Sequence, residues 1–76
     1  MDSLIGKRVI VKLRDRVVLS GILSSFDPGT NILQLDDTEE FDELGRLKMR
    51  GNMVIWSTNV LYIREQMHVF NRYDQG

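Results

Sequence analysis

Two short segments, residues 26–33 and 51–60, constrain the fold of this chain more than any other part of its sequence. Each runs from an apolar stretch through a polar turn into a new apolar stretch. In the first, Asp27, Pro28 and Gly29 favour a tight turn, because Pro fixes φ and Gly readily supplies a positive φ. Two strand–turn–strand segments of this kind predict a small antiparallel β fold.

Alternation of apolar and polar side chains indicates the remaining strands. Val9, Val11 and Leu13 alternate with basic residues, which is typical of a half-buried strand. Gly21 lies inside a long strand-like stretch, where a glycine marks a bend, a bulge or a close backbone approach. The pattern predicts a helical turn at residues 1–6 and strands at 7–13, 17–27, 32–35 (fading toward 40), 46–56 and 60–63.

The expected fold class is therefore all-β: a short N-terminal helical turn followed by a five-stranded, strongly bent antiparallel barrel. Residues 1–66 form the expected barrel domain, and residues 67–76 form a C-terminal tail in which Phe70 and Tyr73 are candidates for docking. Residues 41–45 are expected to be an exposed acidic loop. No linker divides the chain.

The size of the chain makes a lone core marginal. A domain of 76 residues buries only about 60% of its unfolded surface. The chain has no cysteine, and His68 is its single histidine, so neither a disulfide nor a metal site is expected to brace it. Oligomerisation is the remaining way to bury apolar surface.

The last two predicted strands are apolar on both faces, at residues 53–56 and 60–63. If they lie at opposite edges of an open barrel, each is a template for pairing with another chain. Pairing of the fourth strand of one copy with the fifth of the next is a head-to-tail contact, which closes into a ring if the rotation closes. The alternative is a monomer whose tail covers one edge.

Charge is distributed unevenly although the net charge is only −1 and the pI is about 5.7. Residues 7–16 carry five basic side chains and one acidic one, whereas residues 36–43 carry six acidic side chains and no basic one. One interpretation is a solvated strand face and a solvated loop. The other is a bipolar particle with a basic and an acidic surface. The net charge argues against nonspecific binding of nucleic acid by bulk electrostatics.

The motifs resemble those of the Sm/LSm family. Residues 6–15 resemble the opening strand, and Gly21, Asp27 and Asn31 match the first family motif together with its hydrophobic pattern. Residues 51–63 fit the second motif, and the resemblance covers about residues 4–64. It implies a short helix and a five-stranded bent barrel, with rings formed by pairing of the fourth and fifth strands of neighbours. It also implies binding of single-stranded, often uridine-rich RNA at the inner rim of the ring.

The resemblance assigns expected RNA-binding roles to five residues. Asn31 matches the asparagine that reads the base edge, and Asp27 matches the turn aspartate, which holds the loop. Gly29 and Trp56 stand where the family carries a stacking side chain and an arginine, and Thr58 follows in the second motif. Trp56 offers a stacking surface but no phosphate pairing, and it could instead pack at a subunit interface.

Arg16 and the segment 50–52 also bear on the match to the family pattern. Arg16 stands where the family often has a turn glycine. Arg50, Gly51 and Asn52 match the letters of the second motif, but that register would halve the fourth strand and leave residues 54–63 outside the barrel, so Trp56 is preferred.

The expected function is that of an Sm-like ring protein that binds single-stranded RNA in RNA processing or regulation. The alternative is an Sm-fold scaffold for protein assembly that has lost the RNA pocket. The expected partners are RNA, further copies of the chain and other Sm-like subunits. No catalytic constellation, cofactor motif, metal site, signal peptide or membrane span is visible, which favours a cytoplasmic or otherwise intracellular protein that is not an enzyme.

Overall fold

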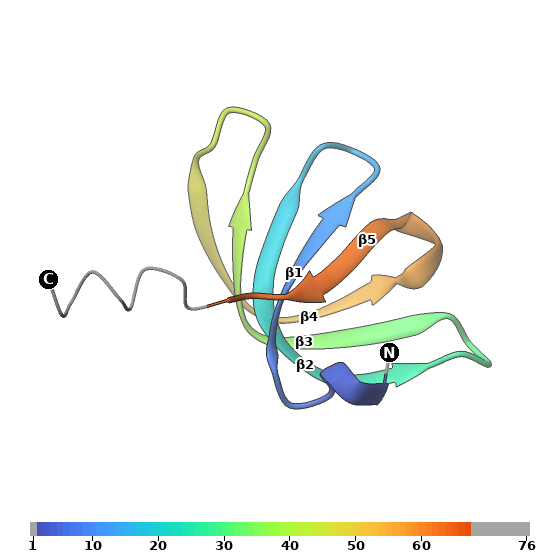
Figure 1. Cartoon of the computed structure of the whole chain (residues 1–76). Helices are drawn as coiled ribbons and strands as arrows, with labels where there is room; N and C mark the ends of the chain where they lie inside the picture. Colours follow the sequence, from blue (N-terminus) through green and yellow to red (C-terminus); the bar gives the residue numbers. More distant parts are fainter. Residues whose placement is uncertain (1, 68–76) are drawn as a thin grey trace, which may run out of the picture.

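The computed structural model describes residues 2–67 and shows a single strongly curved sheet (Figure 1). Its elements are η1 (Asp2–Leu4), β1 (Arg8–Leu13), β2 (Val18–Asp27), β3 (Ile32–Phe41), β4 (Leu47–Trp56), η2 (Ser57–Asn59) and β5 (Val60–Glu65). The predicted fold class is confirmed: a short N-terminal 3-10 turn is followed by five antiparallel strands. Gly6, with a φ of 85°, lies between η1 and β1, where the sequence predicted the end of the helical turn.

Alternation along the strands produces the core. In β1, Val9 and Val11 are fully buried, whereas Arg8, Ile10 and Lys12 are only partly buried on the other face. Burial of each such aliphatic side chain contributes about 1.5–3 kcal/mol. The core residues are Val9, Val11, Leu13, Leu19, Leu23, Leu33, Leu35 and Ile55.

The strand order β4-β3-β2-β1-β5 leaves β4 and β5 at the two edges of the sheet. The condition for edge pairing, that the last two strands lie at opposite edges, is therefore met. Both carry large apolar side chains that are exposed in a single copy of the chain. Exposed in this way, they do not stabilise an isolated domain. They are Leu47, Met49, Val54 and Trp56 on β4, and Leu61 and Tyr62 on β5.

Gly21 permits the close approach of β2 to β3. A Cβ atom at this position would lie 3.0 Å from the Asp36 carbonyl oxygen and 3.0 Å from Thr38 Oγ1. The pairing register of the two strands shifts between Ser20 and Ile22. The glycine therefore marks both a bulge and a close contact, as its position in the sequence predicted.

β3 is longer than its apolar pattern predicted, because it continues through the acidic residues to Phe41. It lies between β2 and β4, and Glu39 is opposite Ser20 on one side and Met49 on the other. Backbone hydrogen bonding to two neighbours sustains a strand without an apolar stripe. The predicted loop thus begins at Asp42 rather than at Phe41.

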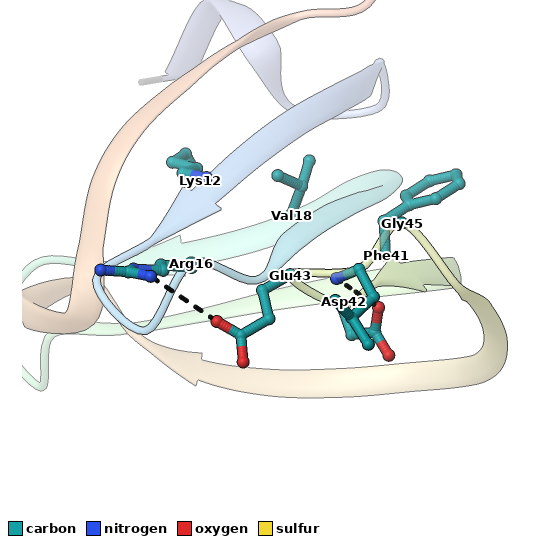
Figure 2. A pocket seen from close by; sticks show the side chains of 8 residues that line it. Lys12, Arg16, Val18, Phe41, Asp42, Glu43 and Gly45 are labelled. Atoms are coloured by element: carbon teal, nitrogen blue, oxygen red, sulfur yellow. Dashed lines mark hydrogen bonds and ion pairs between the residues drawn. The ribbon is translucent and has the colours of Figure 1, made fainter.

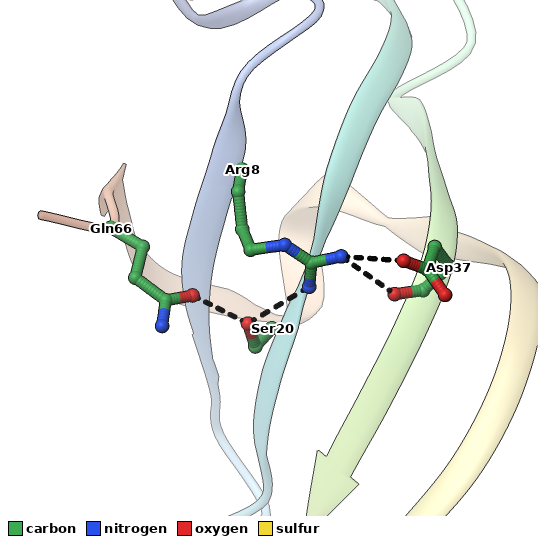
Figure 3. Close-up of polar contacts among 4 residues, drawn as sticks. All are labelled: Arg8, Ser20, Asp37 and Gln66. Carbon is green, nitrogen blue, oxygen red and sulfur yellow. Dashed lines mark hydrogen bonds and ion pairs between the residues drawn. The ribbon is translucent and has the colours of Figure 1, made fainter. Parts of the chain in front are cut away.

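A polar network on the outer face joins four parts of the chain (Figure 3). Arg8 Nη2 donates to Asp37 Oδ2 at 2.7 Å and Arg8 Nη1 donates to Ser20 Oγ at 3.3 Å. Ser20 Oγ donates to Gln66 Oε1 at 2.6 Å, and Gln66 N donates to the carbonyl oxygen of Arg8 at 2.9 Å. The network ties the residue after β5 to β1, β2 and β3.

The basic and acidic segments of the sequence are not separated in space. Arg8 pairs with Asp37 at 2.7 Å and Arg16 pairs with Glu43 at 3.8 Å, so ion pairs join the two segments. Two other acidic side chains, Glu40 and Asp42, pair with arginines of the following segment. The bipolar interpretation of the charge pattern is therefore wrong for these residues, because β1, β2 and β3 are neighbours in the sheet.

Within residues 2–67, no helix is long and apolar enough to cross a membrane. The same residues contain no group of three potential metal ligands. The predictions made for His68, Phe70 and Tyr73 fall on residues 68–76, which lie outside the described part of the chain.

Candidate nucleic-acid interface

The turn between β2 and β3 carries three of the five predicted RNA-binding residues. Asp27 Oδ1 accepts a hydrogen bond of 2.9 Å from the backbone N–H of Gly29, so the aspartate holds the turn from within. Gly29 does not adopt a positive φ; that conformation is found at Asn31, with a φ of 60°. The prediction that Gly29 supplies the positive φ is therefore wrong. Asn tolerates this region better than most residues, because its short polar side chain can bond locally.

The turn between β4 and β5 carries the other two residues. Ile55 is buried at 5% exposure, and Trp56 projects from the opposite face of β4 with 61% exposure. The 3-10 turn η2 then reverses the chain, and Thr58 is exposed on it. An indole that is this exposed in a single copy of the chain is available either to a partner subunit or to a stacked base.

Hydrogen bonds connect the two turns. Ser57 N donates to the carbonyl oxygen of Asn31 at 2.7 Å, and Ser57 Oγ donates to Asn31 Oδ1 at a long 3.4 Å. Trp56 is the register partner of Ile32, the residue after Asn31. The structure thus brings Asn31 of the first motif next to Trp56 and Ser57 of the second, where β3 begins and β4 ends.

Arg14 supports η2 from the end of β1. Its backbone N donates to the Asn59 carbonyl oxygen at 3.0 Å, and its Nε donates to the Thr58 carbonyl oxygen at 3.0 Å. These contacts fix the backbone carbonyl groups of Thr58 and Asn59. They also place a cation beside a turn that has none of its own.

Chemically, the site combines an amide, a hydroxyl and an aromatic face. The Asn31 amide has both a donor and an acceptor, which is what hydrogen bonding to a uracil edge requires. Trp56 supplies a flat apolar surface, whereas Gly29 supplies no side chain on the other turn. The arrangement can stack a base on one side and read its edge.

The alternative position of the second motif is excluded by the fold. Arg50, Gly51 and Asn52 lie inside β4, where Gly51 has a φ of 64° and is opposite Thr38. Arg50 is paired with Glu40 at 3.3 Å. These residues lie in the strand, whereas the residues next to Asn31 belong to the end of β4 and the start of η2.

Sequence reasoning missed Ser57 and Arg14 as parts of this site. Both lay next to motif residues, but their roles depend on which strands are neighbours. The pairing of β1 with β5 brings Arg14 to η2, and the pairing of β3 with β4 brings Ser57 to Asn31. A prediction of the pairing register of β1 with β5 and of β3 with β4 would have revealed both residues.

Comparison with known proteins gives a consistent family assignment. A family model described as the LSM domain matches residues 1–65. The chain is 41% identical over 64 residues to the probable small nuclear ribonucleoprotein F of Arabidopsis thaliana, covering 84% of this chain and 72% of that protein.

Solved structures with the same fold agree. The SmAP1 heptamer of P. aerophilum has a TM-score of 0.77 and 45% identity, and the match covers 87% of this chain and 86% of that chain. The Sm protein of Pyrococcus abyssii, solved in complex with a uridine heptamer, has a TM-score of 0.75 and 29% identity. That match covers 86% of this chain and 90% of the other.

Proposed function

The chain belongs to the LSM domain family, and on this premise we propose that it assembles into a ring that binds single-stranded, uridine-containing RNA at its inner rim. The observation that carries the proposal is the contact between the two motif turns, in which Ser57 holds Asn31 beside the end of β4. Membership of this family also supports the expectation that the protein is not an enzyme.

The two free edges support the assembly part of the proposal. β4 and β5 end the sheet, and each exposes apolar side chains next to unpaired backbone groups. Joining β4 of one subunit to β5 of the next satisfies these groups and removes apolar surface from water. Because the two edges differ, the contact is head-to-tail and closes only at a fixed number of copies. The similar archaeal protein SmAP1 is a heptamer.

The subunits of the ring are copies of this chain or other members of the family. Val54 on β4 and Leu61 on β5 are the exposed side chains that such a contact would cover first. A charged residue in an edge strand opposes pairing. We therefore expect Leu61→Lys to shift the assembly toward smaller species in light scattering at a fixed protein concentration, whereas Leu44→Lys, in the loop after β3, does not.

For RNA binding, we propose that Asn31 reads the base edge and that Trp56 provides the stacking surface. Asp27 and Gly29 shape the first turn, and Thr58 contributes its hydroxyl from the second. The similar Sm protein of Pyrococcus abyssii was solved with a uridine heptamer, which supports a uridine-containing ligand. With no side chain at Gly29, the base is stacked on one face only, so we expect moderate affinity.

The test is fluorescence anisotropy of labelled oligouridine against the size-purified assembly, with oligoadenosine as the control ligand. We expect preferential binding of oligouridine, and a loss of about 10-fold or more in its affinity in Asn31→Gly, which keeps the backbone conformation but removes the amide. If an intact ring binds neither ligand, the RNA part of the proposal fails and the scaffold function remains. If Asn31→Gly binds oligouridine as well as the original chain does, the role of Asn31 is wrong.

A further inference from the structure

A second surface with the chemistry of nucleic-acid binding lies on the outer face of β1 and β5. We define this β1–β5 face by Lys12, Tyr62 and Arg64. Lys12 and Tyr62 are register partners, and Ile10 is the partner of Arg64. Because Ile63 packs against the core, Tyr62 and Arg64 on either side of it project from the opposite face. The three side chains therefore share one patch of the sheet surface.

The aromatic ring of this face is accessible and has a cation beside it. Tyr62 is 47% exposed, and the guanidinium carbon of Arg64 lies 5.9 Å from the centre of its ring. This distance is within the range of a cation–π contact. Such a pair offers a base both a stacking surface and a neighbouring positive charge.

The cations of the β1–β5 face have no acidic partner within the described residues. Lys12 and Arg64 form no ion pair there, whereas Arg8, Arg16 and Arg50 each do. Charge that is not neutralised within the protein remains available to phosphate groups. The net charge of −1 therefore conceals a local positive patch.

The acidic groups that line the same hollow as Lys12 do not cancel its charge. Lys12 borders a shallow hollow of about 630 Å³ that is also lined by Asp42 and Glu43 (Figure 2). Asp42 is bonded to Arg46 at 2.7 Å and Glu43 is paired with Arg16 at 3.8 Å. Both carboxylates are therefore paired with arginines. Neither carboxylate lies at ion-pair distance from Lys12.

We propose that the β1–β5 face binds the nucleotides of a single-stranded RNA that flank the base held at the rim. This inference rests on the proposed function: η2 joins Trp56 directly to β5, so the residues of the rim and of the β1–β5 face lie on consecutive elements of the chain. Edge pairing of β5 uses backbone groups in the plane of the sheet, and it leaves side chains that project from the sheet face accessible. Single-stranded RNA fits better than a duplex, since Tyr62 can stack only on an unpaired base.

The single tryptophan allows the two surfaces to be measured separately. Quenching of Trp56 fluorescence reports occupancy of the rim, and anisotropy of labelled RNA reports total binding. Oligouridine of about 5 nucleotides should fill the rim alone, whereas about 15 nucleotides should also reach the β1–β5 face. We expect the longer RNA to bind about 10-fold more tightly.

The variants are Lys12→Gln with Arg64→Gln, Tyr62→Ser, and the matched controls Tyr62→Phe and Lys48→Gln. The double variant and Tyr62→Ser should lose most of the increase in affinity that the longer RNA shows over the short one. Quenching of Trp56 by the short RNA should be unchanged. In the double variant the slope of log affinity against log salt for the longer RNA should fall by about 0.7 for each phosphate that is no longer neutralised. Tyr62→Phe keeps the stacking surface and Lys48→Gln removes an exposed cation elsewhere, so both should keep the gain. The mass of each assembly is checked first, because Tyr62 lies on an edge strand.

If the double variant still binds the longer RNA more tightly than the short one by the original factor, the inference is overturned. If the original assembly does not bind the short RNA, the proposed function fails, and the β1–β5 face is judged on the longer RNA alone. Binding of that RNA by the original chain and not by the double variant supports the face, and binding by neither overturns it.

Discussion

The backbone N–H of Ser57 donates a hydrogen bond of 2.7 Å to the carbonyl oxygen of Asn31, and the two side chains lie within 3.4 Å of each other. This contact joins two turns that are separated by the whole of β3 and β4. It places the residue expected to read a base at the end of the strand that carries Trp56. The rim site therefore depends on the pairing of β3 with β4 as much as on its own residues.

Asn31 has a structural role that can be separated from its proposed role in binding. With a φ of 60°, it occupies the left-handed region, where alanine costs about 1–2 kcal/mol and glycine costs little. We expect Asn31→Ala to lower the free energy of unfolding by about 1 kcal/mol more than Asn31→Gly does, measured by urea denaturation at one protein concentration. The two variants should be equally poor at binding oligouridine. Equal stability of the two would show that the backbone conformation at this position relaxes in the alanine variant.

Gly29→His is expected to strengthen the rim site. It places a ring on the first turn, where the family carries its stacking side chain, and stacking contributes about 1–3 kcal/mol per base. The added Cβ would lie 3.3 Å from Asp27 Oδ1, which requires only a small shift of that side chain. Oligouridine affinity, measured by anisotropy, should rise by roughly 5-fold or more. Gly29→Ala adds the Cβ without the ring and should leave affinity unchanged; a similar rise in both variants would count against stacking.

Thr38→Val is expected to stabilise the protein. Thr38 is fully buried, and its Oγ1 has no hydrogen-bond partner within the described residues. An unsatisfied buried hydroxyl costs about 1–3 kcal/mol, and valine has the same shape and a high β propensity. Thermal unfolding should show a gain of roughly 1 kcal/mol. Ser20→Ala is the contrasting variant, because Ser20 Oγ bonds to Arg8 and Gln66, and its loss should destabilise. A loss of stability in Thr38→Val would mean that the hydroxyl has a partner in solution.

Gly21→Ala is expected to destabilise the sheet by about 1–3 kcal/mol, since overpacking at a close contact forces the backbone to move. The new methyl group would meet the Asp36 carbonyl oxygen and Thr38 Oγ1, each at 3.0 Å. Adding Thr38→Ala, which removes Oγ1, should not fully rescue the variant, because the Asp36 carbonyl oxygen belongs to the backbone and remains. Denaturant unfolding measures the effect, and full rescue by Thr38→Ala would place the clash at the threonine side chain alone.

The turn after β3 should loosen in acid because of Asp42. The backbone N–H of Arg46 is the main cause that lowers the pKa of Asp42 below its ordinary value of 3.8, with the Arg46 side chain and the Leu44 N–H adding to it. A lowered pKa in the folded state means that the ordering of the turn is present above the ordinary pKa and is lost as the pH falls through the lowered one. The amide resonances of Leu44 and Arg46 should shift with a midpoint below 3.8. Asp42→Asn should reproduce the acid positions of these resonances at neutral pH, and a midpoint above 3.8 would contradict the assignment.

Much of the fold could be predicted from local patterns. Alternation at Val9, Val11 and Leu13 indicated the first strand and its buried face, and apolar residues on both faces of the last two strands indicated the sheet edges. Gly21 indicated a bend, a bulge or a close backbone approach, because a glycine inside a strand marks such a position. These features follow from side-chain period and backbone sterics, which act within a few residues.

The tertiary structure alone decided how separate segments meet. The sequence placed the positive φ at Gly29, but the structure has it at Asn31, and no sequence pattern indicated that Ser57 holds Asn31 or that Arg14 holds Thr58. One of the two interpretations of the charge pattern was a pair of separate charged surfaces, whereas Arg8 and Asp37, distant in sequence, form an ion pair. Such contacts depend on strand order and register, which are fixed by burial of the whole core and by pairing between strands, so no local pattern contains them.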